Sequence, residues 1–456
     1  MSTQLRTLVR TLVVAMSLAA IGADAGAQRA VPSEFWSTLG DTTLVRLVQE
    51  TRVANRDLQI AAARASGARA GRTGAALDLL PIVTTRVGFT RQRIASASFP
   101  GATNAFPDQN VWDAGLALSW EVDVTGRLRR SLRARGALAD AAEEDVRDVE
   151  VVLTSQVAGA YLALRGAQDR LAVARRNAEN QRRTLEVTER RLEAGRGTRL
   201  DTERARSQLS ATLAVIPTLE STIETARQRI RVLTGRSELD ALAFTPAPCD
   251  TLTELPEVPA IGAVDEVVRG RPDVRSAERQ LAASSAFVGA ARAEYLPRLS
   301  IGGAAGYTGS EARALGDAGT PRYVIGPVIS WPAFDLGRVR ANVAGARADE
   351  TQARARYELA QAEAREELET SLLSYRKSRE RLGHLEAAAA ASARAAELAR
   401  LRYVEGGSDF LQVLDAERTL LERENERALG RTEAETGLIA VYRALGGANA
   451  LAGAAR

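Results

Sequence analysis

The stretch that decides the fold runs from residue 337 to residue 406 and reads GRVRANVAGARADETQARARYELAQAEAREELETSLLSYRKSRERLGHLEAAAAASARAAELARLRYVEG. It contains no proline, and it is dominated by alanine, glutamate and arginine, which are strong helix formers. A continuous helix over this span would be on the order of 100 Å long, far more than a globular domain requires. Its apolar residues follow a coiled-coil period, with steps of 4, 3, 7 and 3: Leu368, Leu372, Tyr375, Leu382 and Leu385.

An earlier stretch, residues 126–195, is a twin of this one at an offset of 211 residues. The two stretches have the same length and end in Gly195 and Gly406. Upstream the offset becomes 216 and relates Pro81 to Pro297, so the change of five residues is a difference in loop length. Register kept over this distance predicts a tandem duplication, in which each half consists of a helix, two strands, a long helix and a return helix.

The composition of the 456 residues fits a protein with a sizeable core, since 45% of them are hydrophobic. The net charge of +4 comes from arginine interspersed with glutamate and aspartate, and Lys377 is the only lysine. A nucleic-acid surface would gather its positive charge in one patch, so no nucleic-acid partner is expected. Solvated helix faces explain the charge pattern better.

The first 27 residues have the features of a signal peptide. Two arginines precede a short apolar run, and the small residues 25–27 form a cleavage site before Gln28. A cytosolic amphipathic helix is the alternative. The cleavage site has no cysteine, so a lipid anchor is not indicated, and Cys249, the only cysteine, leaves no internal disulfide. No later run of about 20 apolar residues follows, so any membrane span of the mature chain must consist of strands.

Four segments alternate between an apolar side and a small or polar side, which predicts strands at residues 82–92, 111–122, 298–308 and 322–333. Pro327 inside the last of them suggests a bulge or a missing ladder bond. Their length suits membrane strands, but lipid requires a closed sheet and four strands are too few to close. Several chains must therefore contribute, unless the strands belong to a soluble β-sandwich.

The remaining segments are predicted to be helical, apart from a proline-rich linker at residues 243–262 and a flexible tail at 447–456. The linker separates a first repeat, 28–242, from a second repeat, 263–446. Pro217 predicts a kink in one return helix. The expected helices cover residues 42–79, 126–194, 199–235, 263–270, 272–295, 337–404 and 409–446.

Several motifs together resemble the TolC-like outer-membrane efflux channel family, and the resemblance covers essentially the whole mature chain. The motifs are YLPRLS (295–300), GPVISWPAFDLGR (326–338), RYVEGGSDFLQVLDAERTLL (402–421), SWEVDVTGRLR (119–129) and RRLEAGRGTRLDTERAR (190–206). The resemblance implies an α+β membrane protein and a homotrimer. Its twelve-stranded β-barrel, four strands from each protomer, lies in outer-membrane lipid and continues as an α-helical coiled-coil tunnel through the periplasm. It also implies two partners, a periplasmic adaptor protein and an inner-membrane efflux pump.

The same resemblance assigns roles to residues at the far tip of the helices. Leu411, Asp415 and Arg418 match the family's gate residues, and their spacing puts them on one helix face. Gln412 stands where one branch of the family has a second aspartate, so strong cation block is in doubt. The alternative is that Asp415 and Arg418 simply pair on the helix surface.

Four further tip residues match family positions. Asp201 and Tyr403 match positions that hold the tip closed, although Ser408 replaces the arginine partner found in one branch. Gly195 and Gly406 mark the turns where adaptor hairpins are expected to dock. Glycine at these two positions is also a common way to end a helix, and the two roles are compatible.

No catalytic constellation is present in the sequence. His384 is the only histidine and is expected on a helix face, no Cys/His cluster has metal-ligand spacing, and there is no phosphate-binding loop. The leading hypothesis is a passive exit duct without a cofactor, driven by the pump. A periplasmic coiled-coil adaptor or scaffold would explain the helices but not the strands. An exported enzyme has no support in the sequence.

Overall fold

The computed structural model describes residues 35–36, 39–95, 107–235, 255–257 and 263–447. The predicted signal peptide, Cys249, most of the proline-rich linker and almost all of the tail lie outside these residues. In chain order the elements are α3 (Thr42–Ala54), α4 (Arg56–Leu77), β1 (Ile82–Gln92), β2 (Gln109–Val122), α5 (Arg127–Glu193), α6 (Arg199–Thr234), α7 (Val264–Gly270), α8 (Pro272–Ala293), β3 (Arg298–Gly309), the short 3-10 helix η2 (Ala312–Ala314), β4 (Pro321–Ser330), α9 (Leu336–Val404) and α10 (Phe410–Ala444).

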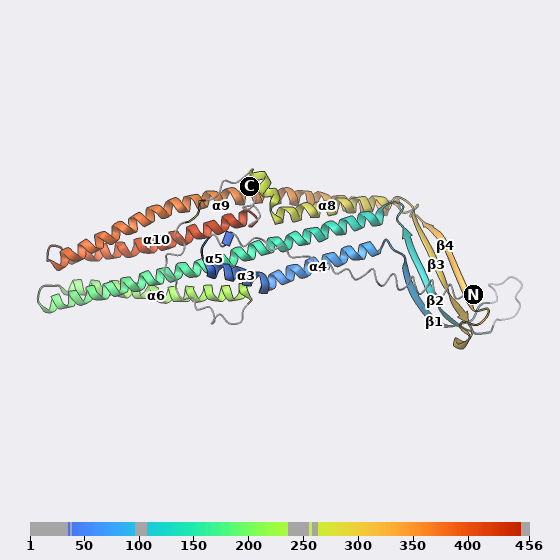
Figure 1. Cartoon of the computed structure of the whole chain (residues 1–456), viewed down its shortest axis with the longest axis horizontal. Coiled ribbons are helices and arrows are strands. Elements are labelled where there is room, and N and C mark those ends of the chain that lie inside the picture. Colours follow the sequence, from blue (N-terminus) through green and yellow to red (C-terminus); the bar gives the residue numbers. More distant parts are fainter. Residues whose placement is uncertain (1–34, 37–38, 96–106, 236–254, 258–262, 448–456) are drawn as a thin grey trace.

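The molecule is elongated, with the sheet at one end and two helical hairpins at the other (Figure 1). The hairpins are α5 with α6 and α9 with α10, and their turns lie side by side at the end farthest from the strands. The long helices α5 and α9 contain 67 and 69 residues and connect the two ends. The predicted order of helix, two strands, long helix and return helix is present in both halves of the chain.

Three expectations about individual elements need correction. The helix expected over 42–79 is two helices, because Asn55 has an extended backbone and its side chain accepts hydrogen bonds from the N–H groups of Asp57 (2.8 Å) and Leu58 (3.1 Å), which starts a new helix. The strand expected to continue to residue 333 ends at Ser330, two residues before Pro332, which has no N–H for a ladder. The register is continuous through the pair Ile301 and Pro327, so the bulge suggested at Pro327 is wrong, whereas the missing ladder bond stays a prediction.

The four strands form one antiparallel sheet in the order β1-β2-β3-β4. The register places most of the large apolar residues of the four strands on one face, while the other face has small or polar residues together with Ile82, Val111, Val324 and Val328. The apolar face includes Val83, Val87, Phe89, Trp112, Leu116, Leu118, Trp120, Leu299, Ile301, Tyr307, Tyr323, Ile325 and Ile329. Both β1 and β4 are edge strands within the protomer, and their apolar side chains are exposed.

The largest buried cluster lies where α3 packs against α5 and α6 and the end of α10 approaches them. Trp36 and Tyr442 are almost fully buried there, with ring centroids 4.5 Å apart. Asp41 caps α3 and also accepts a hydrogen bond of 2.6 Å from the hydroxyl of Tyr161 on α5. This cluster therefore fixes the shorter helices against the middle of the long ones.

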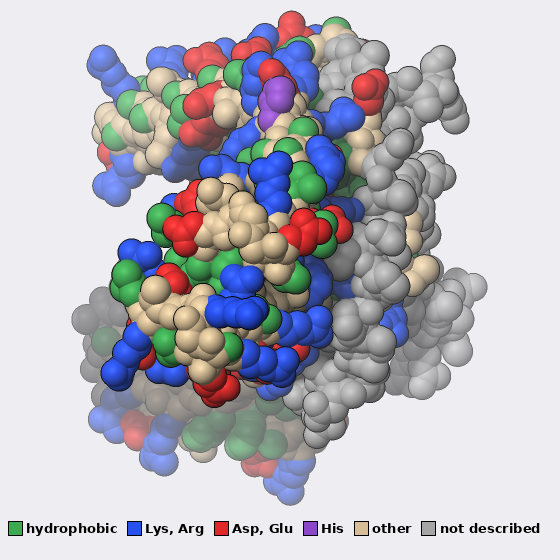
Figure 2. Space-filling view, turned by 90° about the vertical axis from the view of Figure 1, so that its left-hand side faces the viewer, with side chains coloured by type: hydrophobic (Ala, Val, Ile, Leu, Met, Phe, Trp, Pro, Cys, Tyr) green, Lys and Arg blue, Asp and Glu red, His purple; other side chains and the backbone are tan. Residues whose placement is uncertain are grey.

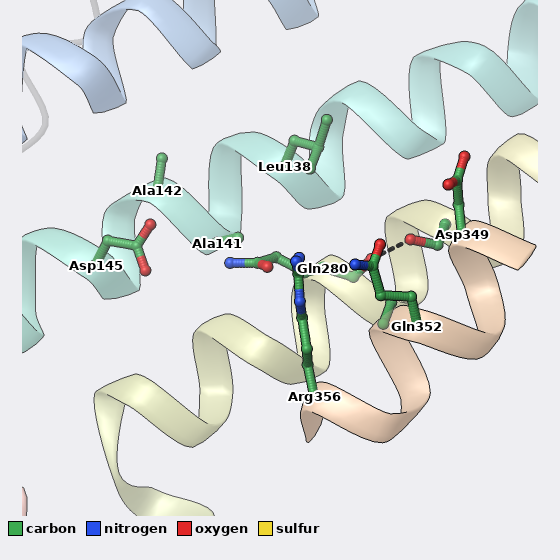
Figure 3. Close-up of a pocket in the computed structure, with 10 residues that line it drawn as sticks. Leu138, Ala141, Ala142, Asp145, Gln280, Asp349, Gln352 and Arg356 are labelled. Carbon is green, nitrogen blue, oxygen red and sulfur yellow. Dashed lines mark hydrogen bonds between the residues drawn. The ribbon is translucent and has the colours of Figure 1, made fainter. Parts of the chain in front are cut away.

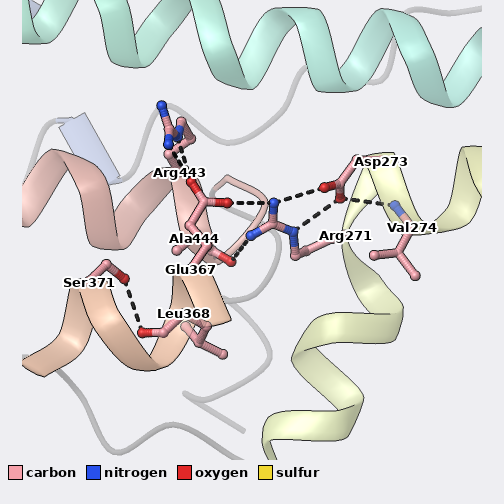
Figure 4. A network of polar contacts seen from close by, with 8 residues as sticks. All are labelled: Arg271, Asp273, Val274, Glu367, Leu368, Ser371, Arg443 and Ala444. Atoms are coloured by element: carbon pink, nitrogen blue, oxygen red, sulfur yellow. Dashed lines mark hydrogen bonds and ion pairs between the residues drawn. The ribbon is translucent and has the colours of Figure 1, made fainter. Parts of the chain in front are cut away.

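A buried arginine joins three helices near this core (Figure 4). Arg271, just before α8, binds both carboxylate oxygens of Asp273 at 3.0 and 2.8 Å and Glu367 of α9 at 2.8 Å. It also donates to the carbonyl of Ala444 at the end of α10, at 2.8 Å. Burial opposes ionisation of Glu367, but hydrogen bonds from Arg271 and Arg443 outweigh this and hold the pKa of Glu367 below its usual value.

Replacing this arginine is expected to destabilise the protein strongly. Arg271→Ala leaves Asp273 and Glu367 without their shared cation, and breaking a buried pair typically costs about 3–5 kcal/mol. The thermal unfolding midpoint of the purified protein in detergent measures the loss. Arg338→Ala is the matched control, since Arg338 forms a solvent-exposed pair with Asp335 and should change stability by less than about 1 kcal/mol. Equal midpoints for the two variants would contradict this role of Arg271.

A second prediction concerns pH. Burial is the main reason why the pKa of Asp148 rises to about 6, and the negative charges of Asp273 and Asp145 add to it. An acid with a raised folded-state pKa costs stability above that pKa, and the cost disappears as pH falls toward the unfolded-state value. Asp148→Asn should therefore stabilise the protein at pH 7.5 by about 1–2 kcal/mol and have little effect near pH 4. Unfolding midpoints at both pH values measure this, and a pH-independent difference would contradict it.

Candidate functional site

The candidate site is the tip formed by the two hairpin turns. Each turn follows a long helix and ends it with the same arrangement of hydrogen bonds. At the first turn the N–H of Arg196 donates to the carbonyl of Arg191 at 2.8 Å, and at the second the N–H of Gly407 donates to that of Arg402 at 2.8 Å. Gly195 and Gly406 have φ values of +71° and +80°, which other residues rarely adopt. Glycine is therefore required for the turn itself at both positions.

These two turns are also open surface. A Cβ atom built on either Gly195 or Gly406 would meet no atom within 4 Å. Figure 2 looks onto this end of the molecule and shows arginine and acidic side chains interspersed over it, not gathered by sign. A partner that docks on the turns therefore meets accessible backbone and a mixed charge pattern.

The four predicted gate residues all lie at the start of α10 and are exposed. Leu411, Gln412, Asp415 and Arg418 point away from the buried side of α10, which carries Phe410 and Val413. Asp415 and Arg418 form an ion pair of 3.1 Å on the helix surface, with both side chains more than half exposed. Arg418 also lies 4.0 Å from the carboxylate of Glu422 on the same helix, and all four side chains are exposed and available to a neighbouring chain.

Asp201 and Tyr403, predicted to hold the tip closed, lie on different hairpins and are not bonded to each other among the described residues. Asp201 lies in the first turn of α6, where its N–H donates to the hydroxyl of the N-cap residue Thr198 at 3.2 Å and its carboxylate accepts from the same hydroxyl at 2.6 Å. Tyr403 is buried against Phe410, with ring centroids 5.6 Å apart, and the guanidinium carbon of Arg191 lies 4.1 Å from the centre of its ring. A contact between Asp201 and Tyr403 of neighbouring protomers stays a prediction.

The sequence reasoning missed a line of polar residues that joins the two hairpins, which we call the polar seam. It consists of four side chains of α5 at a spacing of seven residues: Arg170, Asn177, Thr184 and Arg191. In that order, they donate to Asn425 (2.8 Å), Glu424 (2.8 Å), Glu417 (2.9 Å) and the carbonyl of Tyr403 (2.8 Å). The heptad spacing of polar residues inside an otherwise apolar coiled-coil pattern is the signal that could have found it.

Glu417 is the most buried charge of the tip region, with only 2% of its surface exposed. Arg400 of α9 donates to it at 2.8 Å and Thr184 of α5 at 2.9 Å, so one carboxylate holds α5, α9 and α10 together. It lies on the opposite side of α10 from Asp415. The tip thus has a buried ionic contact, Arg400 with Glu417, which fixes the helices. It also has an exposed ion pair, Arg418 with Asp415, which solvent, ions or another chain can reach.

The described part of the chain offers no candidate metal site. It contains no group of three or more His, Cys, Asp or Glu side chains that could hold a metal ion, and His384 is exposed on α9. A shallow hollow of about 280 Å³ lies among α5, α8 and α9 and is lined by mostly polar side chains, including Asp145, Gln280, Asp349, Gln352 and Arg356 (Figure 3). It holds no nucleophile with an adjacent base. No described helix is long and apolar enough to cross a membrane.

Comparison with known proteins agrees with this architecture. The family model described as outer membrane efflux protein matches residues 47–236 and 263–447. The pyoverdine export outer membrane protein OpmQ of Pseudomonas aeruginosa is 31% identical over 420 residues, which cover 91% of this chain and 87% of OpmQ. The toluene efflux pump outer membrane protein TtgF of Pseudomonas putida is 31% identical over 412 residues, covering 89% of this chain and 84% of TtgF.

Solved structures show the same fold. The outer-membrane channel OprN is 40% identical with a TM-score of 0.81, and the match covers 91% of this chain and 92% of that one. The MtrE outer membrane channel of Neisseria gonorrhoeae, solved in an open state, is 26% identical with a TM-score of 0.81 and 89% coverage of both chains. The family model alone spans well over half of the residues, and the chain therefore belongs to the outer membrane efflux protein family.

Proposed function

We propose that this protein is the outer-membrane exit duct of a tripartite export system. It would passively conduct substrates that an inner-membrane pump and a periplasmic adaptor deliver to it. The single observation that carries the proposal is the continuity of one sheet with helices of 67 and 69 residues that end in an open tip. Helices of this length reach about 100 Å, which suits a structure that bridges two compartments. A scaffold made only of coiled coils would leave the sheet without a role.

The sheet supports a trimer. Its apolar face suits lipid, but β1 and β4 have backbone groups with no ladder partner in the protomer. Unpaired backbone groups in lipid cost several kcal/mol each, so the edges must meet the edges of other copies. Three protomers contribute four strands each and complete a barrel of twelve. The membrane part of the duct would thus form only on assembly, and the signal peptide predicted at residues 1–27 would deliver the chain for it.

The exposed tip residues support a gate and a docking surface. Three-fold symmetry turns Asp415 and Arg418 into rings around the axis, where carboxylates attract cations and arginines limit this attraction. Gln412 leaves one carboxylate fewer per protomer than a tip with aspartate at that position. The open turns at Gly195 and Gly406 would receive the adaptor. The duct itself needs no cofactor and no catalysis, since the pump supplies the energy.

Mass and conductance of the mature chain test the proposal directly. Protein extracted from outer membranes should have the mass of a homotrimer and form ion-conducting pores in planar bilayers. Trimer that is denatured by heat before reconstitution serves as the control and should give no pores. A monomer without conductance would overturn the exit duct and favour a soluble scaffold.

The gate is tested by the double variant Asp415→Ala/Arg418→Ala. Removal of both rings should raise the single-channel conductance severalfold, because the exposed pair no longer narrows the tip or interacts with a neighbouring chain. Arg423→Ala/Glu426→Ala is the matched control, since it removes another pair of the same spacing from the same helix. If both variants conduct like the wild type, the gate lies elsewhere.

A further inference from the structure

The polar face of the sheet carries two arginines in a single row across the strands. The register pairs Arg86 of β1 with Gly115 of β2, Gly115 with Gly306 of β3, and Gly306 with Arg322 of β4. All four residues lie on the face opposite the apolar side chains, because side chains alternate along each strand. In a closed barrel whose apolar face meets lipid, this row faces the lumen.

The two glycines between the arginines are required by close packing. A Cβ on Gly115 would lie 2.6 Å from the carbonyl oxygen of Ala305, and one on Gly306 would lie 2.3 Å from that of Ala114. No side chain can therefore stand between Arg86 and Arg322 in this row. The two arginines start from the opposite edge strands β1 and β4, and the guanidinium of Arg322 reaches across β3 to Asp113 on β2.

One carboxylate is available to these two cations. Asp113 of β2 accepts hydrogen bonds from Arg322 at 2.9 Å and from the hydroxyl of Thr308 at 2.9 Å. Arg86 lies close enough to interact with the charge of Asp113, but it forms no hydrogen bond or ion pair with any residue that the structure describes. The cluster of Arg86, Arg322 and Asp113 thus has a net charge of +1 in each protomer.

Assembly would not neutralise this charge. The edge strand that meets β1 in the trimer is β4 of the neighbouring protomer, whose sequence PRYVIGPVIS contains no carboxylate. The next strand, β3, contains none either. The neighbour's Asp113 is three strands from Arg86, about 14 Å away at the usual strand spacing, and is bonded to its own arginine.

We propose that Arg86 and Arg322 of the three protomers form a cationic belt inside the barrel that binds and favours small anionic solutes, such as those that carry carboxylate or phosphate groups. The inference rests on the proposed trimeric duct and adds a substrate preference to it. Arg322 is partly neutralised by Asp113, so Arg86 supplies most of the attraction. Guanidinium groups suit this role because they stay charged at every physiological pH and bind oxyanions in a bidentate way.

The expected size of the effect follows from simple electrostatics. If each of three guanidinium groups lies about 10 Å from a permeating ion in water, together they favour a monovalent anion about 4.5-fold and disfavour a monovalent cation by the same factor at about 0.01 M salt. Their removal should therefore lower the anion-to-cation permeability ratio about twentyfold at about 0.01 M salt, and about fivefold at about 0.1 M salt, where the screening length is about 10 Å. The belt therefore predicts a selectivity that weakens as salt is added.

The test measures reversal potentials in planar bilayers under a KCl gradient. All proteins carry Asp415→Ala/Arg418→Ala, so that the tip does not dominate the selectivity. Arg86→Gln should lower the anion preference by the factors given above, whereas Arg86→Lys should retain it. Arg91→Gln is the matched control, because Arg91 lies on the same strand with opposite parity and is paired with Asp108. Arg91→Gln changes the net charge by the same amount as Arg86→Gln, but on the opposite face of the sheet. The permeability ratio should therefore stay the same.

The outcomes separate this inference from the proposed duct. Pores that conduct with the same permeability ratio in Arg86→Gln and in the background protein would overturn the belt and leave the duct intact. An equal shift in Arg91→Gln would also overturn it, since the effect would then depend on net charge and not on the inner face. Absence of current from all of these proteins, and from the wild type measured beside them, would overturn the duct and the belt with it.

Discussion

The unpaired backbone of two edge strands is the constraint on which the rest of the structure depends. A four-stranded sheet with an apolar face cannot stay open in lipid, because each N–H and C=O group at its edges would lack a partner. Closure by three copies removes both edges, and it also sets the positions of the helices that follow the strands. The helices leave the sheet directly, with β2 followed by α5 and β4 by α9 after a few residues each. A ring of strands therefore continues as a ring of helices. The pairing of edge strands between copies, which gives their backbone groups partners, also encloses a lumen.

Two kinds of contact, apolar and polar, hold the long helices together. Within each hairpin, apolar contacts such as those of Ile223 on α6 lie beside ion pairs such as Arg400–Glu417 between α9 and α10. Between the hairpins they include the polar seam, which ends at Arg191 beside the turns. Apolar coiled-coil contacts hold a hairpin together as a unit, whereas polar contacts fix its register and are more readily exchanged for water. The tip thus consists of two hairpins that the polar seam joins to each other.

The sequence was sufficient for the architecture because its signals repeat over long distances. The heptad steps from Leu368 to Leu385, the alternation around Trp120 and the constant offset between the halves all depend on local periodicity. The side-chain contacts of the tip do not. Nothing in the heptad pattern distinguishes Glu417, which is buried beside Arg400, from Asp415, which is exposed two residues earlier. The helix break at Asn55 was missed because the cap formed by a single side chain outweighs the helix propensity of the surrounding residues. The side chain of Asn55 also donates a hydrogen bond to the carbonyl of Leu233, which lies 178 residues away in the sequence. Such contacts depend on which helices pack together in the fold, and local periodicity does not specify this.

The two halves of the duplication agree at the turns and differ at the charged positions singled out above. At the offset of 211 residues, Gly406 and Leu411 have the counterparts Gly195 and Leu200, so both turns keep the same shape. Asp415 and Arg418 correspond instead to Arg204 and Ser207, and at the offset of 216 Arg86 corresponds to Gly302. Glycines and apolar seams are retained because both halves need the same turns and the same packing. Charged residues outside the turns and the apolar seams face no such requirement, so Asp415, Arg418 and Arg86 can differ from their counterparts in the other half of the chain.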